Sequence, residues 1–360
     1  MKHLFRTIIL CALLLALLAC GETTAPIAER STPAPQITAT PVIEEDTPKL
    51  STPTPVPTPT PEPTPVPTPE PTATPEPTPT PEPVPTPFSI VWMSDTQNLS
   101  RHNPDVFNCM RDWILSEREA RNIVFFAHTG DVVDGLSQSM WDVATEALMP
   151  ILETIPSMVV SGNHDLSKDL EHGPFLNRPY AKAVLKKGQT FENGLAAYVT
   201  FEAGGDTFLV FGIGYNVRGK KVQAWIRSVR EQYPDAIVLY LMHYALQEDG
   251  RFGSHGKELF DSVIKEDPHA RLLLSGHNDG ALRRTDAFDD DGDGVEDRTF
   301  TTIMFNYQDD RTEGLGYLRI LTFDPVTRSI SVATYSPWFD RWGYPKTRPE
   351  EDAFVLENAF

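Results

Sequence analysis

From Phe88 onward, short apolar runs alternate with stretches of helical periodicity, and this alternation predicts the elements of one globular domain. The apolar runs have strand length and read "FSIVWM", "IVFFAH", "SMVV", "AIVLYLM" and "RLLL". Apolar residues at helical spacing predict helices over about 104–121, 139–152 and 222–232. The glycine-containing stretch "YVTFEAGGDTFLVFGIG" predicts a hairpin. Strands that alternate with helices indicate an α/β sheet.

A polar cluster follows each of the five apolar runs, namely "SDTQ", "TGDVVDG", "SGNHD", "HYAL" and "SGHNDG". Ligands of α/β sheets bind just beyond the carboxyl ends of the strands, so we expect folding to bring these clusters together. Each cluster alone is typical of a turn, because Gly, Asn and Asp tolerate tight turns. Turns do not explain why all five clusters stand at strand ends. The chemistry-bearing residues at these ends are Asp95, Gln97, Asp131, Asn163, His243, His277 and Asp279.

Taken in order, the blocks D-x-Q, G-D-x-x-D, G-N-H-D, a later His and G-H-x-D resemble the calcineurin-like metallophosphoesterase superfamily. The resemblance implies an α/β fold over residues 88–360, a four-layer α/β-β/α sandwich with a two-metal centre at the strand ends. It implies that Asp131 bridges the two metals. The other implied ligands are Asp95, Gln97 and Asp279 for the first metal and Asn163, His243 and His277 for the second. His164 resembles the catalytic histidine of the family, and we expect Asp165 to orient it.

Two positions depart from the family pattern, since many members have His where this chain has Gln97 and Asp279. The first site therefore offers only oxygen donors, which suit manganese, magnesium or calcium, whereas imidazole suits zinc. We expect manganese at the first site. The second site contains His243 and His277, and there zinc or iron is an alternative to manganese.

The expected reaction is hydrolysis of a phosphate monoester or a phosphate diester. Two divalent ions about 3.5–4 Å apart lower the pKa of a bridging water and hold the phosphate oxygens. The resulting hydroxide attacks phosphorus in line, and His164 donates a proton to the leaving alkoxide as a general acid.

Two other functions compete with this interpretation. The first is a non-catalytic lipoprotein that binds a phosphorylated ligand or a metal through a degenerate centre, although a binding protein has no need of His164. The second is a nuclease, which the formal net charge of −19 disfavours because nucleic acids are themselves polyanions. The charge therefore favours a small phosphorylated substrate over a nucleic-acid polymer.

The first 87 residues predict export and tethering. Lys2 and Arg6 precede the apolar run "TIILCALLLALLAC", which is short for a bilayer span and typical of a signal peptide. Its end, with Gly21, resembles the lipobox of bacterial lipoproteins, so we predict a signal peptide over 1–19 and lipidation of Cys20. The alternative is an ordinary signal peptide that contains a cysteine. We expect a cell-surface protein that is held to the membrane by its lipid alone.

Residues 20–87 are rich in Thr-Pro and Pro-Glu and contain little apolar material, as in "TPTPVPTPTPEP". Such a segment cannot offset its chain entropy by burying apolar surface, and proline favours extended polyproline II. We predict a disordered linker.

An acidic stretch near the C-terminal third, "DDDGDGVEDR", contains Asp289, Asp291, Asp293 and Asp297. It resembles the calcium loops of thrombospondin repeats but lacks the Glu that closes an EF-hand loop. The alternative is a solvated hairpin tip between "ALRRTDAF" and "TFTTIMFNY".

Overall fold

The computed structural model describes residues 85–185, 189–308, 310 and 315–360. The predicted signal peptide, Cys20 and nearly all of the linker lie outside these residues, so their properties remain predictions. Among the helices within the described ranges, none is long and apolar enough to cross a membrane.

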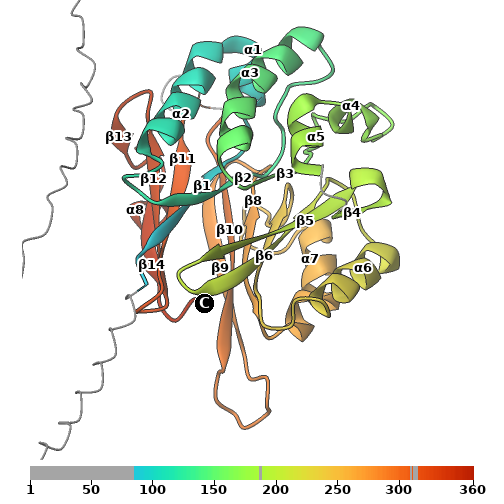
Figure 1. Ribbon diagram of the computed structural model, residues 1–360, viewed down its shortest axis with the longest axis vertical. Coiled ribbons are helices and arrows are strands. Elements are labelled where there is room, and N and C mark those ends of the chain that lie inside the picture. Colours follow the sequence, from blue (N-terminus) through green and yellow to red (C-terminus); the bar gives the residue numbers. More distant parts are fainter. Residues whose placement is uncertain (1–84, 186–188, 309, 311–314) are drawn as a thin grey trace, which may run out of the picture. The chain divides into compact units, whose positions relative to one another are not determined.

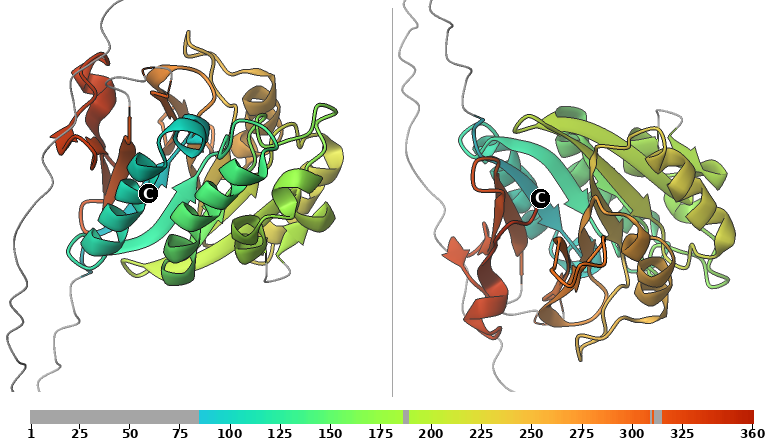
Figure 2. Two further views of the ribbon diagram at one scale, coloured as in Figure 1. Left: turned by 90° about the horizontal axis from the view of Figure 1, so that it is seen from above. Right: turned by 90° about the horizontal axis from the view of Figure 1, so that it is seen from below.

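Two seven-stranded sheets pack against each other, with helices on their outer sides (Figures 1 and 2). The first sheet has the order β13 (Arg341–Trp342), β12 (Ser329–Ser336), β11 (Leu318–Asp324), β1 (Phe88–Met93), β2 (Ile123–His128) and β3 (Ser157–Val159), with β14 (Ala353–Leu356) paired to β12. The second has the order β4 (Thr190–Phe191), β5 (Ala196–Ala203), β6 (Asp206–Ile213), β7 (Ile237–Met242), β8 (Ala270–Ser275), β10 (Arg298–Asn306) and β9 (Gly280–Phe288).

Each sheet has its own set of covering helices. The helices are α1 (Gln97–His102), α2 (Pro104–Glu117), α3 (Gln138–Thr154), α4 (Gly173–Leu176), α5 (Pro179–Leu185), α6 (Lys220–Arg230), α7 (Ser254–Ser262) and α8 (Pro349–Asp352), with short 3-10 turns at Glu192–Gly194 and Ile264–Glu266. Apolar residues of α2, α3 and α5 pack on the first sheet, and those of α6 and α7 pack on the second. The predicted helices are confirmed, with ends that differ by a few residues.

The core explains why the central strands are continuous apolar runs. In β1, Ile90 and Trp92 face the second sheet, whereas Val91 and Met93 face α2 and α3. A strand that is covered on both sides has no polar face, so alternation is lost. Apolar residues fill the space between the two sheets and the space between each sheet and its helices. The order helices, sheet, sheet, helices confirms the four-layer sandwich.

The arrangement of the parallel strands places the polar clusters at one edge of each sheet. In the first sheet β1 and β2 run parallel, as do β2 and β3. In the second sheet β6, β7 and β8 run parallel. Because all the carboxyl ends of a parallel set lie at one edge, the loops that follow these strands converge between the two sheets.

Candidate metal centre

Asp95 and Asp131 lie in the loops that follow β1 and β2. Both have φ of 52°, in the left-handed region that Asp adopts more readily than most residues. Their side chains are almost completely buried, with 3% and 2% exposure. Two buried carboxylates are costly unless partners or a cation neutralise them.

A chain of hydrogen bonds holds the Asp95 carboxylate. Trp92 Nε1 donates to Thr129 Oγ1 (2.9 Å), Thr129 donates to Ser94 Oγ (2.6 Å), and Ser94 donates to Asp95 Oδ2 (2.5 Å). The backbone N–H of His277 also donates to the carboxylate, 3.2 Å from each oxygen. Burial outweighs the attraction of the His243 charge and raises the pKa of Asp95 to about 7.

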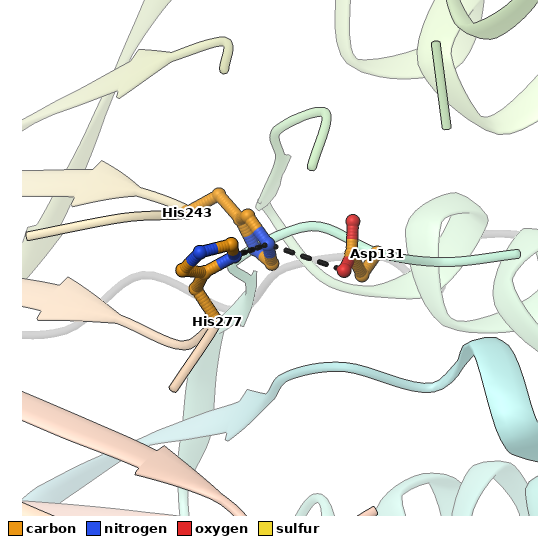
Figure 3. A group of neighbouring side chains, drawn as sticks. All are labelled: Asp131, His243 and His277. Carbon is orange, nitrogen blue, oxygen red and sulfur yellow. Dashed lines mark hydrogen bonds and ion pairs between the residues drawn. The ribbon is translucent and has the colours of Figure 1, made fainter. Parts of the chain in front are cut away.

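Three further donor atoms surround Nε2 of His243. Asp131 Oδ2 lies 3.2 Å and His277 Nδ1 3.1 Å from this nitrogen (Figure 3), and Asn163 Oδ1 also lies 3.1 Å from it. His243 Nδ1 lies 2.9 Å from the carbonyl oxygen of Thr129, which only accepts, so Nδ1 carries the hydrogen and Nε2 can offer a lone pair. Ligand atoms about 2.1 Å from one metal ion lie roughly 3 to 3.5 Å apart. The set therefore fits one divalent cation.

The charges at this set are also compatible with a bound cation. Burial alone would lower the pKa of His243, but the carboxylates of Asp131 and Asp95 outweigh burial and raise it to about 9. Burial together with the His243 charge lowers the pKa of His277 to about 4. In the metal-free state His243 is therefore protonated, and its positive charge is stabilised by the two carboxylates. A metal ion would replace that proton.

Two glycines let the backbone approach the buried carboxylates. A Cβ on Gly162 would lie 2.1 Å from Asp131 Oδ1, and a Cβ on Gly276 would lie 2.0 Å from Asp95 Oδ2. Any larger residue would displace the carboxylate. The glycines of "SGNHD" and "SGHNDG" therefore shape the centre.

Gln97 supplies a buried oxygen that lacks a partner. Its Nε2 donates to Asp131 Oδ2 (3.1 Å), whereas its Oε1 has no hydrogen bond within the described part of the chain. A buried acceptor without a partner is costly, and a cation beside Asp131 would satisfy it. Asp279, the remaining predicted ligand of the first site, is exposed, and its role as a ligand stays a prediction.

His164 lies beside the donor cluster and is 44% exposed. Its Nε2 is 4.0 Å from Asp131 Oδ2, and its Nδ1 is 2.9 Å from Asp134 Oδ1. Arg101 pairs with the other oxygen of Asp134. Although partial burial acts in the opposite direction, the hydrogen bonds from Arg101 and His164 lower the pKa of Asp134, so it is a carboxylate that accepts from His164.

The expectation that Asp165 orients His164 is wrong. The Asp165 carboxylate is fully buried and accepts backbone N–H groups of Val132 (2.9 Å), Val133 (3.1 Å) and Gly162 (2.8 Å). It ties the loop after β2 to the loop after β3. Burial, together with the charge of Asp131, raises the pKa of Asp165 to about 7. Its role is to position both loops.

The family model described as calcineurin-like phosphoesterase matches residues 88–278. This range contains every predicted ligand of the two-metal centre except Asp279. The chain belongs to the calcineurin-like phosphoesterase family. The side chains of Asp131, His243 and His277, which lie close enough together to hold a metal ion, agree with membership of this family.

The relatives of this chain differ from it in length and sequence. The uncharacterized protein YvnB of Bacillus subtilis (strain 168) is 30% identical over 277 residues, which cover 75% of this chain and 21% of that protein. The chain thus spans about a fifth of this curated relative.

Solved structures with a similar fold include TT1561 of Thermus thermophilus, with 12% identity, a TM-score of 0.41 and coverage of 70% of this chain and 100% of that one. GAP50, the anchor in the inner membrane complex of Plasmodium, has 12% identity and a TM-score of 0.43, and the match covers 76% of this chain and 88% of that one. The sulfate thiohydrolase SoxB of Thermus thermophilus has 12% identity and a TM-score of 0.34, and the match covers 78% of this chain and 58% of that one.

Sequence reasoning missed two residues that shape the candidate metal centre. Asp134 is the second Asp of the G-D-x-x-D block, so the block itself was the signal. His128, the last residue of β2, is fully buried, with Nε2 3.0 Å from Thr96 Oγ1 and Nδ1 accepting from the Gly130 N–H (3.2 Å). Burial and the His243 charge lower the pKa of His128 to about 3, so it is a neutral support for the loop.

The acidic stretch lies at the tip of the β9–β10 hairpin, which projects from the sandwich (Figure 1). Carboxylate oxygens of Asp289, Asp291 and Asp297 lie within 4.8 Å of one another, and all three residues are exposed. The Asp289 side chain also accepts three backbone N–H groups of the loop. Exposed acidic loops form without a cation as well, so both alternatives, a calcium loop and a solvated tip, remain.

Proposed function

We propose that this protein hydrolyses monoesters or diesters of phosphate with two divalent cations at the centre described above. The observation that carries the proposal is the position of His164. Its imidazole stands beside the cluster of metal donors and is oriented by Asp134, outside the donor set itself. A protein that only captures a metal or a phosphorylated ligand needs no such histidine.

The donors divide into two sets that share Asp131. The first would be Asp95, Gln97, Asp131 and Asp279, and the second would be Asp131, Asn163, His243 and His277. When bound, the cations would supply positive charge for the phosphoryl oxygens and a more acidic water. The buried carboxylates, the Gln97 oxygen and the two glycines would fix where those cations sit.

His164 would act on the leaving group. In the protonated imidazole, Nδ1–H donates to Asp134, and Nε2–H is on the ring edge nearer Asp131, with Nε2 4.0 Å from Asp131 Oδ2. When the P–O bond breaks, the electron pair stays on the leaving oxygen, and that oxygen takes the Nε2 proton. The imidazole is then neutral and keeps its bond to Asp134.

Donor chemistry suggests different preferences at the two sites. We propose manganese for the all-oxygen site and manganese, zinc or iron for the site with His243 and His277. If Asp279 is a ligand, Asp279→His should shift the first site toward zinc. Metal content and rate after reloading the stripped protein with one ion at a time would test this, and equal zinc and manganese loading in both proteins would remove Asp279 from the ligand set.

The test of function uses manganese-loaded full-length protein with p-nitrophenyl and alkyl esters, as monoesters and as diesters. We expect His164→Ala to lower turnover of alkyl esters by about 10²–10⁴-fold, and p-nitrophenyl esters less, because their leaving group needs no acid. Metal content and thermal stability should be nearly unchanged. If the wild type binds metal and phosphate but hydrolyses neither class, the rival function as a binding lipoprotein holds instead.

We further propose that lipid on Cys20 and the proline-rich linker tether this hydrolase to the outer surface of a membrane. The support is compositional, namely the lipobox-like end of the signal peptide and the scarcity of apolar residues in the linker. A Cys20→Ser variant should lose membrane attachment in the producing cell but keep its specific activity. Unchanged fractionation with the membrane would contradict the lipid anchor.

A further inference from the structure

Three rings form a wall beside the second ligand set. Tyr244 follows His243 directly at the end of β7, Tyr215 lies in the loop after β6, and His255 lies in the first turn of α7. We call Tyr215, Tyr244 and His255 the ring wall.

The ring wall is continuous with the metal ligands. The Tyr244 ring centre lies 4.7 Å from that of His277 and 5.6 Å from that of His255. The Tyr215 ring centre lies 5.1 Å from that of His255 and 5.9 Å from that of His243. A phosphoryl group at the ligands would therefore have its substituents within reach of these rings.

The local backbone fixes both tyrosines. Tyr244 packs over Gly253, where a Cβ would lie only 2.3 Å from the Tyr244 Cζ atom. The Tyr215 N–H donates to the carbonyl oxygen of Ser161 (3.0 Å), in the loop that also carries Asn163. A ring that is held by packing, as that of Tyr244 is, binds a flat partner with little loss of side-chain entropy.

The ring wall is not accounted for by packing of the core. All three residues are half-buried, and none belongs to the apolar clusters that fill the described sandwich. Arg218 is exposed, lies close enough to act electrostatically on Tyr215 and His255, and makes no ion pair with a residue that the structure describes. Aromatic faces next to an available guanidinium suit a flat ligand that carries negative charge.

We propose that the ring wall binds the retained ester group of a phosphodiester, and that this group carries a planar aromatic ring, as a nucleoside does. This inference rests on the proposed hydrolysis. His164 contacts Asp131 and Asp134, whereas the ring wall contacts His243 and His277, so leaving and retained groups meet different side chains. Stacking on the rings would favour an aromatic group over a small alkyl group.

The experiment compares two diesters with the same p-nitrophenolate leaving group, p-nitrophenyl thymidine 5′-phosphate and ethyl p-nitrophenyl phosphate, on manganese-loaded full-length protein. We expect kcat/KM to be roughly 10- to 100-fold higher for the nucleoside ester, since stacking of a base on an aromatic side chain has about this effect. Tyr244→Leu and Tyr215→Leu should each lower the ratio of the two kcat/KM values by about 5-fold or more. Tyr244→Phe, which keeps the ring, should keep the wild-type ratio.

The ratio separates binding by the rings from damage to the centre, because a structural lesion or lost metal lowers both rates together. Tyr233→Leu, which removes a half-buried tyrosine that packs on Tyr198 instead of on the metal ligands, should leave the ratio unchanged. A wild-type ratio near one, or a ratio that the leucine variants do not change, would overturn the inference while leaving the proposed hydrolysis intact. Failure to hydrolyse either diester or any monoester would instead overturn the proposed function.

Discussion

At the residue scale, neighbouring aspartates have separate tasks. Asp134 accepts from the imidazole of His164, whereas Asp165 accepts three backbone N–H groups and touches no reacting group. Sequence order alone suggested the reverse, because Asp165 is adjacent to His164 in the chain. Adjacent residues of a tight loop point in different directions, and only the folded backbone decides which carboxylate meets the ring.

This division predicts opposite effects for two conservative substitutions. Asp134→Asn should lower kcat for alkyl esters by roughly 10- to 100-fold, less than His164→Ala, with little change in thermal stability. Asp165→Asn should instead lower stability by about 1–3 kcal/mol, because an amide NH₂ would face one of the N–H donors. Urea unfolding and steady-state kinetics on both variants check this. Similar kinetic losses with equal stability would contradict the separation.

His243 gives the metal-free protein a characteristic dependence on pH. Its pKa is raised from 6.5 to about 9 in the folded state, so the folded protein keeps a proton that the unfolded chain has released. The stability from that proton is fully present below pH 6.5 and is lost as pH rises through 9. Asp95, with a pKa raised to about 7, acts in the same direction just below neutrality.

We therefore expect the Tm of chelator-treated protein to fall between pH 7 and pH 9. Added Mn²⁺ should raise Tm more at pH 9 than at pH 7, because fewer protons must leave the ligands. Thermal unfolding at several pH values, with and without Mn²⁺, measures both effects. A metal-free Tm that is constant or rises over this range would mean that His243 does not hold the proton.

At the element scale, the loops after the strands build the centre. Two glycines of these loops cannot be replaced by a larger residue without moving a ligand carboxylate. Gly162→Ala would place a methyl group 2.1 Å from Asp131 Oδ1. We expect Mn²⁺ affinity to fall by at least tenfold and stability to fall by about 1–3 kcal/mol, the usual cost of overpacking. Isothermal titration of stripped protein checks the affinity.

Gly173→Ala is the matched control, since a Cβ at this first residue of α4 meets no atom within 4 Å. It should leave Mn²⁺ affinity unchanged. Equal affinity in the two variants would show that Asp131 does not need the close approach of Gly162.

The strand ends were predictable because the central strands are buried on both faces and read as unbroken apolar runs. β1 and β2 have the predicted bounds, and polar residues follow each at once. The pairing of the outer strands was harder to predict. β11 pairs with β1 across more than two hundred residues of sequence, for example Val91 with Ile320, and no local pattern specifies such a partner. Contacts between loops of different sheets, such as that of His277 with Asp95, are equally remote in sequence.

At the scale of the whole molecule, the sandwich contains every residue that is predicted as a ligand of the two-metal centre, and the N-terminal residues contribute none. Deleting residues 21–84 should therefore leave kcat and KM for soluble substrates within about twofold, because a proline-rich linker has little apolar surface to pack on the domain. Steady-state kinetics on the shortened and full-length proteins compare them. A large loss of activity or of Tm would show that the linker supports the domain.

The most direct measurement of metal-dependent hydrolysis follows bound metal and rate in the same samples. Stripped full-length protein receives Mn²⁺ in increments, and bound metal and hydrolysis of a p-nitrophenyl phosphate ester are measured at each step. Asp289 and Asp291 are replaced by Asn so that the hairpin tip adds no site. We expect two Mn²⁺ ions per chain, with turnover that rises mainly with the second. Two bound ions without turnover of any monoester or diester would show that the centre only binds.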